Sequence, residues 1–519
     1  MERTSPVTVL LIMLLVHAPA DAQSFGKAAW IRQVWTTNSV GSMDIAVGSG
    51  EEVFLTGTLS HRMDVYFEAS PSDADLMDTP LFFSGFLARY DGRDGSLVFV
   101  RSGRDRLVPV LPRSYRYGRS VAVVGDRLFH HESSGLQRDT VSDMVTVRDL
   151  EGSELKRIGP HERSSAYPTM VINGTEFDTR GNLYMVGTFG EPLHFSPDMV
   201  LTPSRVAIYS HPPNVIFLAS YAPNGTLRWA QQIGNDSMNL VRGSYGLSGK
   251  AAFDVDSAGN TVLGIGFWHQ PPDAFSTAVD GSALVWYSRD GKLLRVQTLE
   301  DLGISYEPSL TELRNNPVRA GESSISGASN YILYPIIVRH DNNGNLYVVW
   351  RKASTKDRSN SVTVGDTTFY PAENRYLYVL TKVDAQGALL WGRHLEHDHS
   401  MTPKGIETTE HGHAYLYGDF HGRYLVLGGV ELTQEEPRLN GGFVAHFDGD
   451  GHLVRALHAT GPGVQSVKTL ALGPDGDVYV VGYKYRADTV VIGADTVLAK
   501  GANNVIVAKY AAAPRSSTH

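Results

Sequence analysis

Short runs of alternating apolar and polar residues, separated by turns rich in glycine, asparagine and aspartate, follow one another along almost the whole chain. Residues 181–189 (GNLYMVGTF) give the clearest case, a tight turn followed by apolar residues of β-branched and aromatic type. Such alternation between turn residues predicts a strand, and no long stretch carries the 3.6-residue period of a helix. Related segments bring the number of copies to about seven, and they lie at residues 51–58, 125–129, 259–263, 344–350, 412–418 and 476–482.

Each turn-and-strand copy has companions in a fixed order. A short apolar segment precedes it, and a strand of the form apolar-x-Ala-basic-aromatic follows it, as at residues 86–90 and 506–510. A further strand then begins Gly-x-Leu and often continues x-Trp, as at residues 225–229 and 387–391. Four strands therefore make one unit. About seven such units predict an all-β fold, a single β-propeller with four-stranded blades, because radial repetition leaves only short sheet edges.

The two ends of the chain complement each other. The last unit stops at Tyr510 without its Gly-x-Leu-x-Trp strand, whereas residues 26–34 (GKAAWIRQV) align with residues 225–233 (GTLRWAQQI). We therefore expect the N-terminal strand to pair into the last blade and close the ring. Residues 23–519 would then form one seven-bladed propeller domain, without the polar capping repeats that an open solenoid needs.

The repeat pattern resembles a known family. The series Asp/Gly-Gly-Asn-x-Tyr-Val-x-Gly, then Phe-x-Ala-Lys/Arg-Tyr-Asp, then Gly-x-Leu-x-Trp is similar to the bacterial seven-bladed β-propeller repeat (SBBP-type) family of secreted and cell-surface proteins. The resemblance covers nearly all of residues 23–519, and the second and fourth units depart from it most. It implies a propeller fold and an exported protein, but it implies no catalytic residues, because the family shares no catalytic motif.

The first residues predict export. A polar start with Arg3, an apolar run over residues 7–16 and the small-x-small site at residues 20–22 are typical of a signal peptide over residues 1–22. The apolar run is too short to span a bilayer, so no membrane span is expected after its removal. The chain has no cysteine, which excludes disulfides and a lipid-modified N-terminal cysteine. We expect a periplasmic or extracellular protein that is not a lipoprotein.

Charge argues against one class of partner. The formal net charge is −9 over 519 residues, which is mildly acidic and opposes binding to nucleic acid. The long connections between repeats are expected on one face, around the mouth of the central channel, where loops usually carry function. The predicted loops are residues 60–81, 104–119, 191–213, 299–330, 352–373 and 421–440.

One of these loops is rich in arginine and tyrosine. Guanidinium groups bind carboxylates and phosphates in bidentate fashion and tyrosines stack on sugars, so the loop is a candidate site for an anionic glycan; the alternative is a solvated loop whose arginines pair with nearby acidic residues. The candidate ligand-binding residues are Arg104, Arg106, Arg113, Tyr115, Arg116, Tyr117 and Arg119.

A histidine cluster around the sixth unit is the weaker candidate. His394, His397 and His399 include a His-x-His pair, which can chelate a transition metal when alternate strand residues share a face. The repeat alignment explains His413 as a turn variant instead. Acidic turns such as residues 341–345 lack the full calcium-loop pattern and are interpreted as hairpin turns.

No nucleophile elbow, zinc-protease helix, phosphate loop or sialidase box is present. We predict no cofactor and no metal. The sequence favours a secreted, non-enzymatic binding or scaffold module, monomeric, that engages a protein or glycan on its long-loop face. The alternative is a hydrolase or lyase acting on polysaccharide, which carboxylates or histidines converging at the channel mouth would favour.

Overall fold

The structure is a computed structural model. It describes residues 23–36, 40–59, 65–68, 74–77, 84–102, 116–134, 143–162, 170–203, 215–233, 238–239, 252–267, 282–307, 333–352, 361–371, 376–485, 489–500 and 503–512. Every regular element within these ranges is a β-strand, so the predicted all-β class is confirmed. None of the described residues forms a helix with the length and hydropathy that a membrane crossing requires.

The described strands pair into nine sheets of three to seven strands, and for reference we number the four-strand groups within them as blades in chain order. Blade 1 is β3 (Val40–Val47), β4 (Glu52–Leu59), β7 (Ser84–Asp91) and β8 (Leu97–Ser102), and blade 2 is β9 (Arg116–Val124), β10 (Arg127–Ser134), β11 (Asp143–Arg148) and β12 (Glu154–Ile158). Blade 3 is β14 (Val171–Phe177), β15 (Leu183–Phe189), β18 (Val215–Tyr221) and β19 (Leu227–Ile233). In blade 4, β20 (Met238–Asn239) and β21 (Phe253–Val255) both pair with β22 (Thr261–Phe267), which β23 (Ser282–Tyr287) and β24 (Leu293–Thr298) follow.

Blade 5 is β26 (Leu333–His340), β27 (Leu346–Lys352), β30 (Leu377–Val383) and β31 (Leu389–His397), and blade 6 is β32 (Ser400–Thr408), β33 (Ala414–His421), β36 (Asn440–Phe447) and β37 (Leu453–Thr460). Blade 7 combines β38 (Val464–Leu472), β39 (Val478–Tyr485) and β42 (Asn503–Tyr510) from the end of the chain with β2 (Trp30–Thr36) from its start. The pairing of β2 with β42 is antiparallel and runs from Trp30 opposite Lys509 to Thr36 opposite Asn503.

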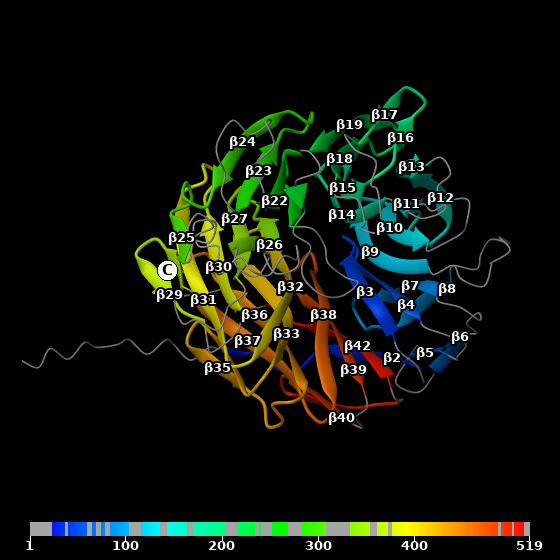
Figure 1. The fold of residues 1–519 in the computed structure, drawn as a ribbon. Helices are drawn as coiled ribbons and strands as arrows, with labels where there is room; N and C mark the ends of the chain where they lie inside the picture. The colour runs from blue at the N-terminus through cyan, green and yellow to red at the C-terminus, as the bar shows by residue number, and fades with distance from the viewer. Residues whose placement is uncertain are drawn as a thin grey trace, which may run out of the picture.

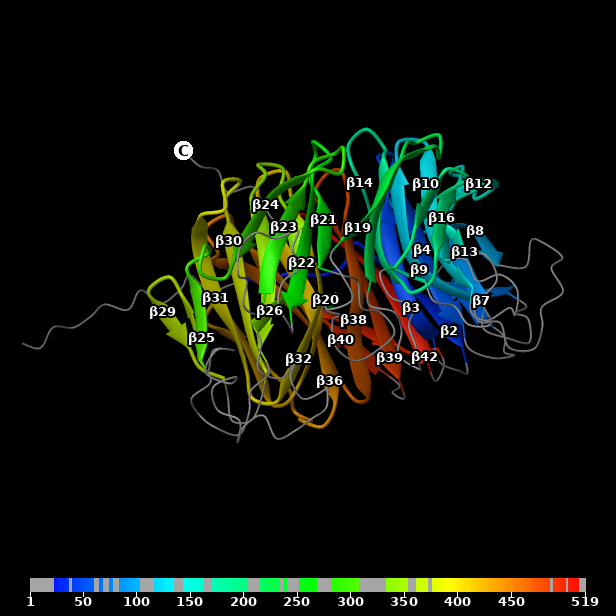
Figure 2. The ribbon, with the colours of Figure 1, turned by 45° about the horizontal axis from the view of Figure 1, so that its top comes forward.

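The blades are arranged around a common centre, with the first strand of each blade innermost (Figure 1). The innermost strand β3 contacts both β9 and β38, its neighbours on either side. The strands run between the two ends of this ring (Figure 2). This arrangement of sheets is that of a β-propeller.

The turns from first to second strand and from third to fourth strand lie at one end of the ring, which we call the short-turn end. In blade 1 these two turns are joined by the hydrogen bond from the Gly92 N–H to Glu51 O. The connections from second to third strand and from blade to blade lie at the opposite end, which we call the long-connection end.

The recurring tryptophans link neighbouring blades. Trp391 on the outer strand of blade 5 donates its indole N–H to Gly449 O in blade 6 at 3.0 Å. Gly451 begins the Gly-x-Leu strand of blade 6, and a Cβ atom there would lie 2.8 Å from the Trp391 ring. Trp30 and Gly95 repeat this contact between blades 7 and 1, with a Cβ distance of 2.7 Å. The glycine of the motif therefore makes room for the tryptophan of the preceding blade.

The prediction that six long ranges are loops is wrong where they are described, because each range contains strand residues; the other parts of these ranges, among them 104–115, 204–213 and 308–330, lie outside the described residues. Four of the six ranges, and one connection that was not predicted, hold whole hairpins. The hairpins are β5–β6 (Val65–Glu68, Ala74–Met77), β16–β17 (Leu193–Ser196, Met199–Leu201), β28–β29 (Ser361–Val364, Thr367–Phe369), β34–β35 (Tyr424–Leu427, Val430–Thr433) and β40–β41 (Thr489–Ile492, Asp495–Leu498).

These hairpins lie at the outer edge of the ring and not at its centre. β5 pairs with β2, β34 pairs with β31 and β40 pairs with β37, so each hairpin extends the sheet of the preceding blade. β16 and β28 instead pair with the short strands β13 (His161–Glu162) and β25 (Ile304–Glu307), which follow blades 2 and 4. The physical reason is burial: Leu425 and Leu427 alternate inward on β34 and are fully buried.

Candidate functional site

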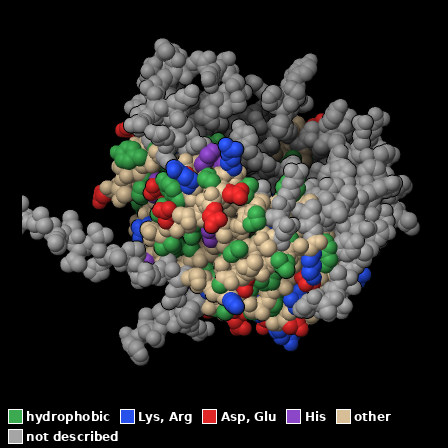
Figure 3. All heavy atoms as spheres, turned by 90° about the horizontal axis from the view of Figure 1, so that it is seen from below, with side chains coloured by type: hydrophobic (Ala, Val, Ile, Leu, Met, Phe, Trp, Pro, Cys, Tyr) green, Lys and Arg blue, Asp and Glu red, His purple; other side chains and the backbone are tan. Residues whose placement is uncertain are grey.

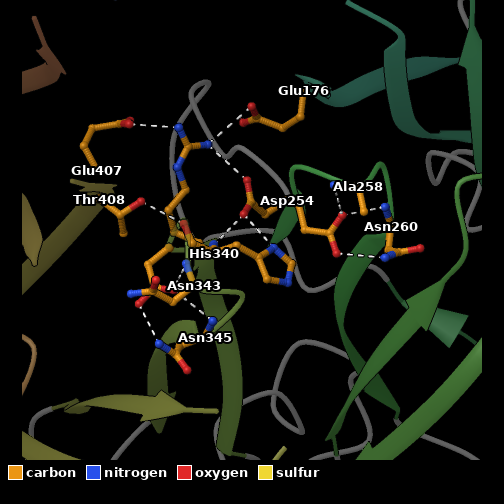
Figure 4. A network of polar contacts seen from close by, with 12 residues as sticks. Glu176, Asp254, Ala258, Asn260, His340, Asn343, Asn345, Glu407 and Thr408 are labelled. Carbon is orange, nitrogen blue, oxygen red and sulfur yellow. Dashed lines mark hydrogen bonds and ion pairs between the residues drawn. The ribbon is translucent and has the colours of Figure 1, made fainter. Parts of the chain in front are cut away.

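A cluster of charged residues lies on the innermost strands of four consecutive blades, near the short-turn end (Figure 4). Arg339 on β26 is the centre of the cluster. Its guanidinium lies 3.3 Å from Glu176 on β14, 3.1 Å from Asp254 on β21 and 2.9 Å from Glu407 on β32. The Arg339 and Glu176 side chains are each 28% exposed and Glu407 is 24% exposed, so solvent reaches the cluster.

Asp254 and His340 form a buried pair beside this cluster. Asp254 Oδ2 accepts hydrogen bonds from the backbone N–H of His340 at 2.5 Å and lies 2.9 Å from Nδ1 of its ring. Burial by itself would raise the pKa of Asp254, but the charge of Arg339 and the bonds from His340 outweigh it and hold this pKa below its usual value. Glu407 is the largest influence that keeps the pKa of Arg339 well above its usual value.

The four charged residues occupy one repeat position. Glu176, Asp254, Arg339 and Glu407 each lie two residues before the first residue of the turn between first and second strands. The same position carries Ala471, Ala46 and Val123 in blades 7, 1 and 2. One side of the ring is thus charged at this level and the other is apolar.

This arrangement brings together groups able to exchange protons. A carboxylate that is hydrogen-bonded to a histidine ring fixes the orientation of that ring, as it does in enzymes that use histidine as a general base. A guanidinium can stabilise a developing negative charge. The cluster is not arranged for a metal, because the guanidinium occupies the point at which its carboxylates converge. Within the described ranges, no group of three or more histidine, aspartate or glutamate side chains is placed to hold a metal ion.

A second polar group joins blades 6 and 7. Lys404 on β32 forms an ion pair with Asp419 on β33 and donates to Ser466 Oγ on β38 at 2.7 Å. Asp419 also accepts the backbone N–H of Val467 at 3.0 Å. Burial lowers the pKa of Lys404 to about 8, although the charge of Asp419 acts in the opposite direction. The contacts of Lys404 and Asp419 with Ser466 and Val467 tie blade 6 to blade 7, so the role of this group is structural.

The arginine and tyrosine candidates are only partly described. Arg104, Arg106, Arg113 and Tyr115 lie outside the described residues. Arg116, Tyr117 and Arg119 belong to β9, so this part of the predicted loop is strand. Arg119 stands at a β-bulge, because Ser120 pairs with His131 and Gly118 pairs with Glu132. The prediction of an anionic ligand at these residues remains untested.

The histidine candidates do not converge. The ring of His394 stacks on Phe369 at 5.5 Å, the ring of His397 packs on Tyr378, and the ring of His399 lies 4.5 Å from His421. Burial lowers the pKa of His394 to about 4. These contacts are packing contacts and do not support the alternative of a metal site.

The acidic turns have the geometry of hairpin turns, as interpreted from the sequence. Asp341 Oδ1 accepts the backbone N–H groups of Asn343 and Asn345, each at 2.9 Å. Elsewhere on the surface, charges are mixed: acidic, basic and apolar side chains intermingle over the described part of the face in Figure 3.

Sequence reasoning missed the charged position on the inner strands. Glu176, Arg339 and Glu407 are far apart in the chain, and each follows a different apolar pattern. Aligning the first strands on their turns places all three at one level, so the signal was present, but it required the strand register.

Comparisons with known proteins identify no family for this chain. No protein-family model matches the chain, and no curated protein resembles it in sequence, so the predicted repeat family stays a prediction. The chain is similar to the solved WD40 domain of SCAP from fission yeast, with 10% identity, 92% of this chain and 98% of that chain covered, and a TM-score of 0.34.

Two further solved structures are similar at the same low level. A member of the DUF4221 family from Bacteroides vulgatus has 10% identity over 75% of this chain and 91% of that chain, with a TM-score of 0.32. The rhamnogalacturonan lyase YesW has 10% identity over 80% of this chain and 76% of that chain, with a TM-score of 0.30. Likenesses this weak carry no argument about function. The class of the protein, a β-propeller, rests on its own sheets.

Proposed function

We propose that the chain is an exported binding or scaffold module, a closed seven-bladed β-propeller that engages a protein or glycan at its long-connection end. The observation that carries this proposal is how carboxylates on the first and second strands of the blades are used. Asp254 accepts a backbone N–H of blade 5, and Asp419 accepts one of blade 7. Charged groups committed to neighbouring blades serve to hold a rigid platform, which is what a binding module needs.

Closure of the ring is supported at both junctions with the first blade. β2 supplies the fourth strand of blade 7. Asp44 on β3 accepts a hydrogen bond from Thr469 Oγ1 of blade 7 at 2.9 Å and from the backbone N–H of Val121 of blade 2 at 3.1 Å. A closed ring has no exposed terminal blade, so it needs no capping repeat.

Export and the repeat family belong to the same proposal. The signal sequence at residues 1–22 and the resemblance to the SBBP-type family support a periplasmic or extracellular location without a lipid anchor. Cell fractionation of a tagged chain tests this directly. Recovery in the cytoplasm with residues 1–22 still attached would count against it.

A ligand screen read out by thermal unfolding tests the binding function. A ligand that binds only the folded protein raises the unfolding midpoint as its concentration exceeds the dissociation constant. We expect a dose-dependent rise with a glycan, or capture of a defined envelope protein. If the midpoint stays constant with glycans and no protein is retained at stoichiometric level, the binding function is wrong.

The second candidate is a polysaccharide hydrolase or lyase, which the cluster around Arg339 favours. Glu176, Glu407 and the Asp254–His340 pair converge near the centre of the ring, and the lowered pKa of Asp254 is a perturbed titration. The cluster carries three carboxylates against one guanidinium, so its field repels an anionic polymer and suits a neutral one.

Depolymerisation of neutral polysaccharides, followed by the release of reducing ends, tests this candidate. Glu407→Gln should abolish release, while Glu431→Gln on the outer hairpin serves as control. No release by the wild-type chain, or equal release by the Glu407 variant, would remove the enzyme alternative.

A further inference from the structure

Arg351 lies in the middle of a row of tyrosines in blade 5. On β27 it stands directly opposite Tyr334 of β26 on one side and Tyr378 of β30 on the other. Its guanidinium carbon lies 3.7 Å from the ring centroid of Tyr376, the residue before β30, and 6.0 Å from that of Tyr334. Residues directly opposite in an antiparallel sheet share a face, so three strands present these side chains together.

Among the described residues, no carboxylate is paired with this buried arginine. Its residue is 5% exposed, and its Nε atom is buried with no hydrogen-bond partner. Among the described residues, no aspartate or glutamate forms an ion pair with it, and the groups that raise its pKa against the effect of burial are Tyr378, Tyr334 and Tyr376. Buried charges in proteins are normally paired, because an isolated ion loses its hydration without compensation.

Blade 6 shows how the same register position is otherwise satisfied. Asp419 faces Thr402 across the first strand pair, as Arg351 faces Tyr334. It is fully engaged by Lys404, Ser466 and the backbone of Val467. The comparison identifies Arg351 as the charged member of this position that has rings around it in place of an ionic partner.

The location fits the proposed function. Arg351 is the next-to-last residue of β27 and Tyr334 is the second residue of β26, so both lie at the long-connection end. Tyr376 is half-buried and presents part of its surface to solvent. A guanidinium stacked on a ring keeps its in-plane N–H groups available, and these match the two oxygens of a carboxylate.

We propose that Arg351, with Tyr334, Tyr376 and Tyr378, binds the carboxylate of an acidic sugar residue. The guanidinium edge pairs with the carboxylate, and the exposed part of Tyr376 packs on the sugar ring. This inference rests on the proposed binding function and specifies its ligand class as a glycan that contains hexuronic acid.

Isothermal titration with trigalacturonic acid tests the proposal on the full exported chain. We expect binding that is lost when the carboxylates of the probe are methyl-esterified. Arg351→Gln should weaken binding about tenfold or more, the loss typical of a hydrogen bond to a charged group. Arg295→Gln is the matched control, because Arg295 also stacks on an aromatic ring, 3.9 Å from the Trp286 centroid, but in blade 4.

Each remaining outcome is decisive. Equal binding of the acid and its methyl ester overturns the proposal without any protein variant, so it stays testable even if Arg351→Gln fails to fold. Competition by inorganic sulfate at equal concentration would show a general oxyanion site and would overturn the assignment to a sugar carboxylate. If a neutral glycan or a protein binds equally well to wild type and Arg351→Gln, the proposed function stands and this inference fails.

Discussion

Phe25 offers a direct test of how the start of the chain is held. It directly follows β1 (Gln23–Ser24), which pairs in parallel with β37, the outer strand of blade 6. The Phe25 ring is 6% exposed, and its centroid lies 5.7 Å from that of Tyr510 and 6.3 Å from that of Tyr415. The guanidinium of Arg455 lies 4.0 Å from the ring centroid. Blades 3, 5 and 7 have tryptophan at this position of the outer strand, whereas blade 6 has Arg455, and the Phe25 ring packs there instead.

Phe25→Ala should therefore destabilise the protein as a core substitution does, although the residue is near the chain start. Removing a buried phenylalanine costs about 3–5 kcal/mol. We expect the lower limit, about 3 kcal/mol, because a short terminal strand relaxes more easily than an internal one. For a chain of this length the entropy of unfolding converts that loss into a fall of about 3 °C in the unfolding midpoint.

Differential scanning calorimetry at matched scan rates measures this shift. Leu390→Ala is the control, since Leu390 is also a large apolar residue on an outer strand but is 51% exposed. A midpoint for Phe25→Ala within about 1 °C of the control would refute the docking of β1, given the expected shift. Deletion of residues 23–34 removes most of β2 as well and should lower the midpoint further; an unchanged midpoint there would refute closure through blade 7.

Three further outcomes follow from the described contacts. The pKa of Asp254 is depressed in the folded protein, so its stabilising contribution is complete above pH 4 and is lost as pH falls through the folded pKa; Asp254→Asn should flatten the acid limb of urea midpoints against pH. Gly451→Ala places a side chain at φ 79° with its Cβ 2.8 Å from Trp391 and should cost about 2 kcal/mol, whereas Gly449→Ala, with 3.8 Å to its nearest atoms, should cost little; equal urea midpoints would contradict this. Burial lowers the pKa of His446 to about 3, so the unfolded chain takes up its proton first and stability falls from about pH 6.5 towards 3; His446→Phe should reduce that fall, and an identical pH profile would exclude the assignment.

Much of the fold could be predicted because the repeated residues meet local packing and hydrogen-bonding requirements. Gly451 must leave space for Trp391, and Asp341 must accept the N–H groups of its turn. Such requirements recur in several blades, so they appear as sequence motifs. The pairing of β2 with β42 was predictable for the same reason, since residues 26–34 carry the strand pattern that the last unit lacks.

The hairpins at the outer edge were missed although they have a signal. Residues 424–433 (YLVLGGVELT) and 489–498 (TVVIGADTVL) each alternate apolar residues around a glycine-containing turn. Each strand is only four residues long, and a hairpin of that length is marginal by itself. It becomes stable by pairing with the preceding blade, which is a tertiary contact that local patterns do not contain.

The candidate sites were harder to predict because they depend on departures from the repeat. Only the strand register shows that the charged residues of the inner strands lie at one level. Trp350 stands where other copies have glycine, and Arg351 follows it. A motif search ignores such positions because their residues differ from one copy to the next. The Arg116–Arg119 segment was found by composition, but composition could not show that it begins a strand.

Departures from the repeat divide into two kinds by how they are compensated. Blade 6 replaces tryptophan with Arg455, and the loss is made good within the chain, because Phe25 supplies the ring and Tyr415 accepts a hydrogen bond from the guanidinium. Blade 5 introduces Arg351, and among the described residues no carboxylate compensates its charge. The first kind is explained by stability alone. The second leaves a buried ion with no carboxylate partner among the described residues, and for this reason we propose Arg351 as the place to look for a ligand.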